Sequence, residues 1–205
     1  MSKTLEHRLR TTQFEIPIFM VRFQVMTLIV GLTIDKSISI VLSNPSPFRV
    51  FCAIYLWFTL FNFYHAKITA TENEDYFMRD YNHPLLSIVD FALNIMLIGS
   101  FLFISYLLSD FYNFLIANIA MRTLDSLLVG LSLWILHSRG KLSSSLTLAH
   151  SYWALTDIVI IVIFSLYLLL GSPDEPCVVA VIVLLIAMTD PCLDYWINRG
   201  MYFNT

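Results

Sequence analysis

Long runs of apolar residues constrain this chain more than any other feature of its sequence. Two examples are IVIIVIFSLYLLLG at 158–171 and VVAVIVLLIAM at 178–188, which are apolar on all sides when wound as helices. Such a helix belongs in a large core or in lipid. Only 13% of the 205 residues are charged, against roughly 25% in a typical soluble domain, and the mean hydropathy is +0.72. The sequence therefore predicts an all-α, polytopic membrane protein.

A helix needs about 20 apolar residues to cross the hydrocarbon core of a bilayer. Six windows have this length, and Pro-rich or polar segments separate them. We expect a six-helix transmembrane bundle over 16–197, with helices at about 16–42, 48–68, 84–107, 111–136, 150–170 and 176–197. Residues 1–15 are expected to form a tail or an interfacial helix, and residues 198–205 a second tail. A different grouping around 111–136 would give five helices.

The basic residues of the predicted loops lie mostly on one side. With the N-terminus inside, the inner segments hold eight Lys and Arg residues, and the outer loops hold only Arg49. Cytoplasmic loops carry such an excess, so we expect a cell-membrane protein with both termini in the cytoplasm. The first apolar run is expected to be a mature helix, because it is long, contains Arg22 and lacks a small-residue cleavage site.

Ionisable residues inside the predicted helices are the most specific functional signal. A charged side chain at the centre of a spanning helix costs about 3 kcal/mol, so such residues should face one another or a wet cavity. Counted at about 1.5 Å per residue, one layer roughly 10 Å from the cytoplasmic edge holds Arg22, Asp90, Asp157 and Asp190. The predicted network consists of Asp90, Asp157, Asp190, Asp125, Asp194, Arg22, Arg122 and His65.

Three details refine this network. Arg122 and Asp125 are expected near mid-membrane, where their i, i+3 spacing lets them pair on one helix face. Pro191 removes a backbone donor and frees the carbonyl of Ala187 beside Asp190, a geometry that can coordinate a cation. The carboxylate of Asp194 could instead extend to the membrane–water interface.

Acids outnumber bases in this set, which favours cations or protons over anions. Because one small bundle has little room for a wide pore, we expect a homo-oligomeric channel or transporter in the lipid bilayer. The alternative for the charges is structural. Buried ion pairs, for example Arg22 with Asp90 and Arg122 with Asp125, would then only fix the register of the helices.

A second functional hypothesis is a non-conducting membrane subunit. It would anchor, sense for or regulate a cytoplasmic partner, for example in a stress or defence system, through the loops 71–83 and 138–149. No basic stripe with interleaved aromatics predicts binding to nucleic acid. We expect no enzyme, metal site or cofactor, because the HExxH and GxSxG patterns are absent and the three cysteines are isolated. Whether Cys52 and Cys177 form a disulfide or two thiols stays open.

Overall fold

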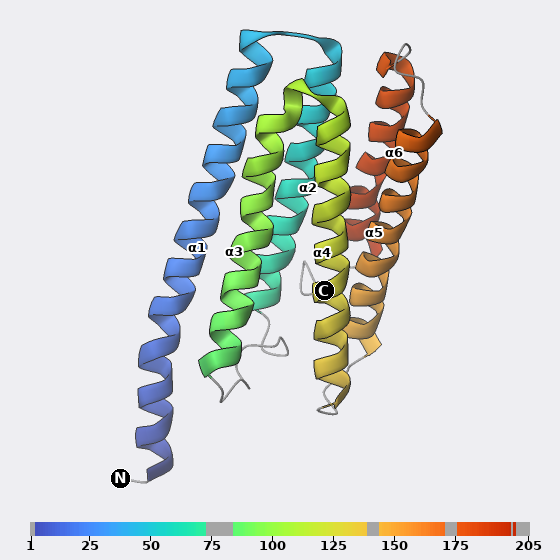
Figure 1. The fold of residues 1–205 in the computed structure, drawn as a ribbon. Helices are drawn as coiled ribbons and strands as arrows, with labels where there is room; N and C mark the ends of the chain where they lie inside the picture. Colours follow the sequence, from blue (N-terminus) through green and yellow to red (C-terminus); the bar gives the residue numbers. More distant parts are fainter. Residues whose placement is uncertain (1–2, 73–83, 139–143, 171–175, 198, 200–205) are drawn as a thin grey trace.

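The computed structural model describes residues 3–72, 84–138, 144–170, 176–197 and 199, and over these residues the chain is all helical (Figure 1). An all-α fold with six α-helices was predicted, and this is confirmed. The helices are α1 (Lys3–Ser43), α2 (Pro47–Glu72), α3 (Pro84–Tyr106), α4 (Phe111–Ser138), α5 (Ser144–Leu170) and α6 (Pro176–Ile197). A short 3₁₀ turn, η1 (Leu107–Ser109), joins α3 to α4.

Simple local chemistry places most helix starts. Pro47, Pro84 and Pro176 each occupy the first position of a helix, where the missing N–H of proline costs nothing. Asp110 begins α4 in a different way, because its Oδ1 accepts a hydrogen bond from the Asn113 backbone N–H at 3.1 Å. The bounds therefore lie close to the predicted windows for all helices except the first and the fifth.

Helix α1 differs from the prediction at its start. It begins at Lys3 and runs for 41 residues, with no break where the tail or interfacial helix of residues 1–15 was expected to end. Residues 3–15 contain neither Gly nor Pro, and the helix continues through Pro17, which lacks a backbone donor. At 1.5 Å per residue α1 is about 60 Å long, and its first turns extend beyond the other helices (Figure 1).

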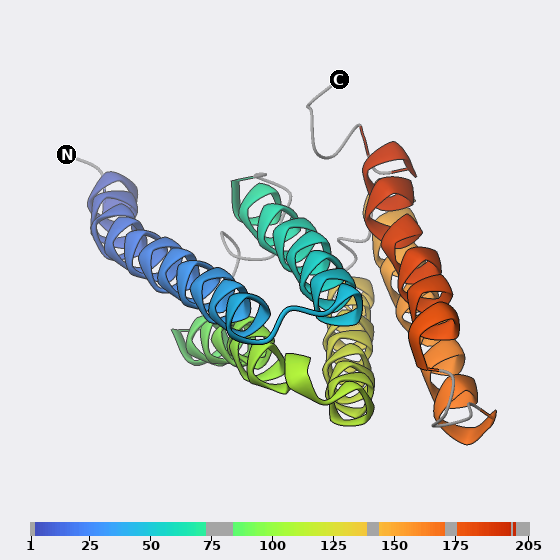
Figure 2. The ribbon, with the colours of Figure 1, turned by 90° about the horizontal axis from the view of Figure 1, so that it is seen from above.

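The helices form two layers, one of α1, α2 and α6 and the other of α3, α4 and α5 (Figure 2). Within the layers α2 contacts both α1 and α6, and α4 contacts both α3 and α5. Contacts between α1 and α3, and between α5 and α6, join the two layers. Successive helices run in opposite directions, so α1 and α6 start at opposite ends of the bundle (Figure 1).

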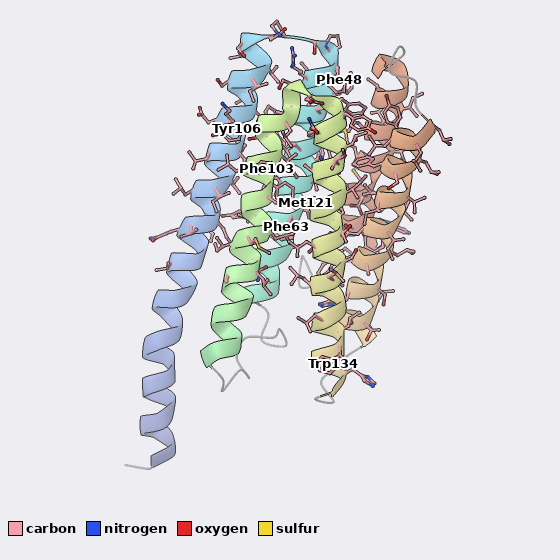
Figure 3. All side chains as sticks on the ribbon, in the orientation of Figure 1. Phe48, Phe63, Phe103, Tyr106, Met121 and Trp134 are labelled. Atoms are coloured by element: carbon pink, nitrogen blue, oxygen red, sulfur yellow. The ribbon has the colours of Figure 1, made fainter. Side chains whose placement is uncertain are left out.

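Four helices contain segments long and apolar enough to cross a membrane, judged over the residues that the structure describes. These segments are Phe23–Ser43, Ala92–Ser109, Phe111–Leu131 and His150–Leu170. Large apolar side chains cover their outer faces: Phe103, Tyr106 and Trp134 lie on the outside of the bundle (Figure 3). An apolar exterior of this extent is what a lipid-facing surface requires, so the fold is that of a membrane protein.

The interior combines an aromatic core with polar side chains. Tyr55, Phe101, Phe114 and Phe164 are fully buried, and Tyr55 contacts both Phe114 and Phe164 edge to face. Cys52 is buried beside them as a free thiol. Polar residues that are also buried include Thr33, Ser37, Thr59, Asn118, Arg122, Asp157, Asp190 and Asp194. Polar groups therefore collect inside the bundle, where the functional site must be sought.

Candidate functional site

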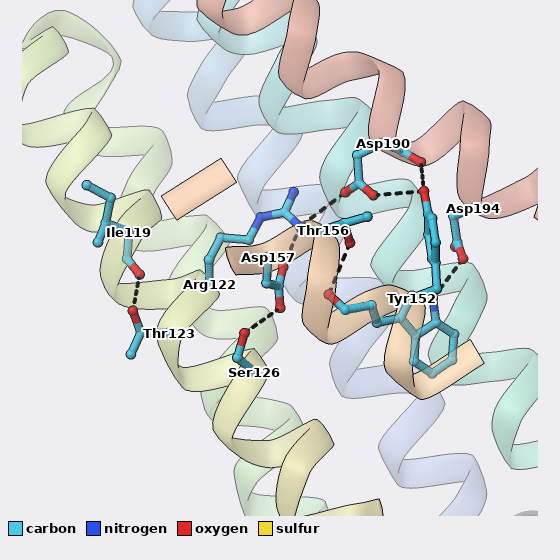
Figure 4. Close-up of polar contacts among 10 residues, drawn as sticks. Ile119, Arg122, Thr123, Ser126, Tyr152, Thr156, Asp157, Asp190 and Asp194 are labelled. Carbon is cyan, nitrogen blue, oxygen red and sulfur yellow. Dashed lines mark hydrogen bonds and ion pairs between the residues drawn. The ribbon is translucent and has the colours of Figure 1, made fainter. Parts of the chain in front are cut away.

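Arg122 lies at the centre of a buried charge cluster that joins three helices. Its Nη1 on α4 donates to Asp157 Oδ1 on α5 at 2.7 Å and to Asp190 Oδ2 on α6 at 3.2 Å (Figure 4). The side chains of Arg122, Asp157 and Asp190 are only 7%, 2% and 11% exposed. One guanidinium therefore bridges two carboxylates inside the apolar bundle.

Neighbouring hydroxyl groups complete the environment of both acids. Ser126 is one turn after Arg122 on α4 and donates to Asp157 Oδ2 at 3.3 Å. Tyr152 lies on α5 and donates to Asp190, at 3.3 Å to Oδ1 and at 3.1 Å to the backbone carbonyl oxygen. Each acid thus has a charged donor and a neutral donor, which offset part of the cost of its burial.

A second polar group lies further along α6. Asp194 is one helical turn after Asp190, is fully buried, and accepts a 2.7 Å hydrogen bond from Trp153 Nε1. The neighbouring Tyr195 hydroxyl lies 2.6 Å from His65 Nδ1 on α2, and the two rings pack together. Polar contacts therefore continue from the cluster toward the C-terminal end of α6.

A cavity of about 50 Å³ borders the cluster between the two helix layers. Its apolar wall includes Phe63, Leu97, Phe101 and Met121. Its polar wall consists of Thr59, Asn62, Arg122, Asp125, Thr156, Asp157 and Asp190. Three carboxylates and one guanidinium thus share a small chamber. Such a set can hold a proton or a cation, because acidic groups exceed basic ones.

The structure brings most residues of the predicted network together. The side chains of the others are not among those that it describes. Arg122, Asp125, Asp157 and Asp190 line the cavity, and Asp194 and His65 belong to the adjacent polar group. The side chains of Arg22 and Asp90 lie outside the described residues, as do residues 73–83 and 139–143 of the two predicted loops. Residues 144–149 were predicted as loop but form the first turns of α5.

The ion pairs of Arg122 run between helices. Its Nη1 contacts Asp157 on α5 and Asp190 on α6, whereas the structural alternative paired Arg122 with Asp125 along α4. The position of Arg122 and Asp125 near mid-membrane stays a prediction, because contacts between side chains do not define a depth in the bilayer.

Several members of the site were not predicted. Tyr152, Ser126, Thr59 and Asn62 are uncharged, so a search for ionisable residues passes over them. Trp153 was not predicted either, although its Nε1 donates to Asp194. The i, i+4 spacing of Arg122 and Ser126 on one helix face was a usable signal.

The fold and the cluster define an all-helical protein of the membrane class with a buried, acid-rich polar centre. Among the described residues, no three His, Cys, Asp or Glu side chains lie close enough together to hold a metal ion. No protein-family model matches the chain, and comparisons with curated proteins and with solved structures likewise find no match.

Proposed function

We propose that the chain is a cell-membrane protein that crosses the bilayer six times with both ends in the cytoplasm. Four helices are apolar enough to span, and α2 and α6 have 26 and 22 residues, which is also sufficient length. The alternation of helix direction and the excess of Lys and Arg in the segments on one side support the same topology.

We propose further that the bundle passes a cation or a proton, with the cavity acids as its binding groups. The observation that carries this proposal is the chamber in which, among the described side chains that line it, Asp125, Asp157 and Asp190 share the cation Arg122. A bundle that needed only to be stable would gain little from this arrangement, because apolar side chains of similar volume stabilise a buried position as well or better. The cavity lies inside one subunit, so assembly into a homo-oligomer stays a prediction from the sequence.

Flux into liposomes tests this function. Purified protein is reconstituted, and proton, Na⁺ and K⁺ fluxes are measured for the native chain and for Asp157→Asn and Asp190→Asn. Each variant should change the flux several-fold, because each removes one acid and disturbs the shared guanidinium. Asp35→Asn is the matched control, since Asp35 is an exposed acid on α1. Folded variants with unchanged flux would reject the proposal.

One observation favours a non-conducting subunit as the second candidate. Arg122 joins α4 to α5 and α6, and a cluster of this kind can hold three helices together without taking part in conduction. In that case the loops 71–83 and 138–149 would dock a cytoplasmic partner. Deletion of 71–80 should then abolish co-purification of that partner while the bundle stays folded, and no ion flux should be found.

A further inference from the structure

The cavity wall carries polar atoms that the protein itself does not satisfy. Arg122 uses only Nη1 for its two acids, and its Nε and Nη2 are buried with no hydrogen-bond partner among the described residues. The same holds for Thr59 Oγ1 and Asn62 Oδ1 on α2. All of these side chains line the same cavity. Donors and acceptors therefore face a common space.

Water fits this space better than any other occupant. A buried polar atom without a partner is costly, so cavities of this kind are filled by water when they are polar and large enough. Each water needs on the order of 15 Å³, so a cavity of about 50 Å³ holds a short cluster. Such waters can accept from Arg122 and donate to Asn62, which satisfies both walls of the cavity.

The position of Arg122 also favours a proton over a metal cation as the ion at this site. A metal cation bound to Asp157 or Asp190 would lie next to the guanidinium that already bridges them. It would also need several oxygen ligands to replace its hydration shell. A proton needs neither, because it moves between a carboxylate and a hydrogen-bonded water without displacing Arg122.

We infer that the cavity between the helix layers is filled by water and that the species it transfers is the proton and not a metal cation. This inference rests on the proposed function and narrows it. A protonated cavity water passes its excess proton to one carboxylate oxygen and becomes neutral water, and that carboxyl group then passes a proton to the next water, which becomes protonated in turn. The groups that face this exchange are Tyr55 and His65 on α2, Arg122 and Asp125 on α4, Tyr152 and Asp157 on α5, and Asp190 and Asp194 on α6.

Hydration of the cavity has a test that does not depend on flux. Met121 lines the cavity and is 5% exposed, whereas Met26 is 2% exposed in the apolar core away from the cavity. Hydroxyl radicals made by X-ray radiolysis of water oxidise methionine, so bound water should mark its neighbour. We expect Met121 of the purified native protein to be oxidised several-fold faster than Met26. Equal protection of the two methionines would overturn the water-filled cavity.

Ion selectivity tests the second half of the inference. In proteoliposomes we expect a pH gradient to drive flux, and Na⁺ or K⁺ gradients to drive none. Thr59→Val should lower the proton flux several-fold, because it removes a hydroxyl from the cavity wall. Thr123→Val makes the same chemical change on the exposed face of α4 and should have no effect (Figure 4).

The outcomes separate the inference from the proposed function. Flux of Na⁺ or K⁺ that depends on Asp157 would overturn the proton assignment and leave the proposed function standing. Absence of every flux would overturn both. Proton flux with Thr59→Val equal to Thr123→Val would overturn the route through the cavity.

Discussion

Arg122 is the residue on which the buried cluster depends. Its Nη1 is the charged donor of both Asp157 and Asp190, so its loss would leave two carboxylates inside the bundle without a cation. Breaking a buried pair by removing one partner is much more costly than never building it, because the remaining charge stays desolvated. The loss of stability in a variant of this cluster therefore depends on which partner is removed.

We expect Arg122→Met to lower the free energy of unfolding by about 3 kcal/mol or more. The measurement is denaturant unfolding in detergent, followed by circular dichroism. Arg49→Met is the control, because the Arg49 side chain donates to the backbone oxygen of Asn44, just after α1, and to no carboxylate among the described residues. Adding Asp157→Asn to Arg122→Met should recover part of the loss. An equal effect of the two arginine variants would contradict the central place of Arg122.

Tyr152 makes a smaller and separable contribution. Tyr152→Phe removes the hydroxyl that donates to Asp190 but keeps the ring, so we expect a loss of about 1 kcal/mol in the same unfolding experiment. Tyr112→Phe is the matched control, since Tyr112 is 58% exposed on the outside of the bundle. A loss that is as large at Tyr112 would show that the Asp190 contact does not matter.

The sequence identifies the charged members of the site but not the contacts between them. Asp157 and Asp190 stand out because charge is rare in apolar helices, and both were expected to lie in one layer. Thr59 and Asn62 do not stand out, because uncharged polar residues are common in membrane helices and are cheap to bury when paired. Their importance arises only when α2 packs against α6 and places them on the cavity wall.

At the scale of the elements, helix ends could be predicted and helix stagger could not. Proline marks the starts of α2, α3 and α6 in the sequence itself. How far each helix is shifted along the bundle depends on side-chain packing between helices, which no single segment encodes. The contacts of Arg122 with Asp157 and Asp190 depend on this packing, so the sequence alone did not pair them.

The start of α4 offers a local test of capping. Asp110→Ala removes the carboxylate that accepts from the Asn113 backbone N–H and from its Nδ2. We expect a loss of about 1 kcal/mol. Hydrogen exchange should accelerate over 111–114 and stay unchanged at the far end of α4. Asp35→Ala, an exposed acid inside α1, should leave exchange in α4 unaltered, and the cap would be refuted if the two variants behaved alike.

At the scale of the whole molecule, the bundle exposes apolar side chains and buries charged ones, which is the reverse of a soluble bundle. Leu169 and Leu170 are 79% and 80% exposed, while Asp157 and Asp194 are buried. Such a surface is stable only in contact with lipid, because the exposure of so much apolar area to water would cost too much free energy. Composition alone predicts this inversion, which is why the class of the fold follows from the sequence.

Cysteine labelling tests the proposed topology of the whole chain. In a chain whose own cysteines are replaced, Asn44→Cys lies between α1 and α2, and His137→Cys lies near the end of α4. A membrane-impermeant maleimide should label Asn44→Cys in intact cells. It should label His137→Cys only after the membrane is opened. Labelling of both from outside would contradict the proposed orientation.

The layer formed by α1, α2 and α6 has a consequence for biogenesis. During translation α4 leaves the ribosome before α5 and α6, so Arg122 enters the bilayer before either of its acidic partners exists there. Because α6 packs against α2, the C-terminal helix must dock onto a helix made long before it. The cluster is therefore complete only after α6 has docked, and in a chain that stops before α6 the Arg122 side chain keeps Asp157 as its partner and lacks Asp190.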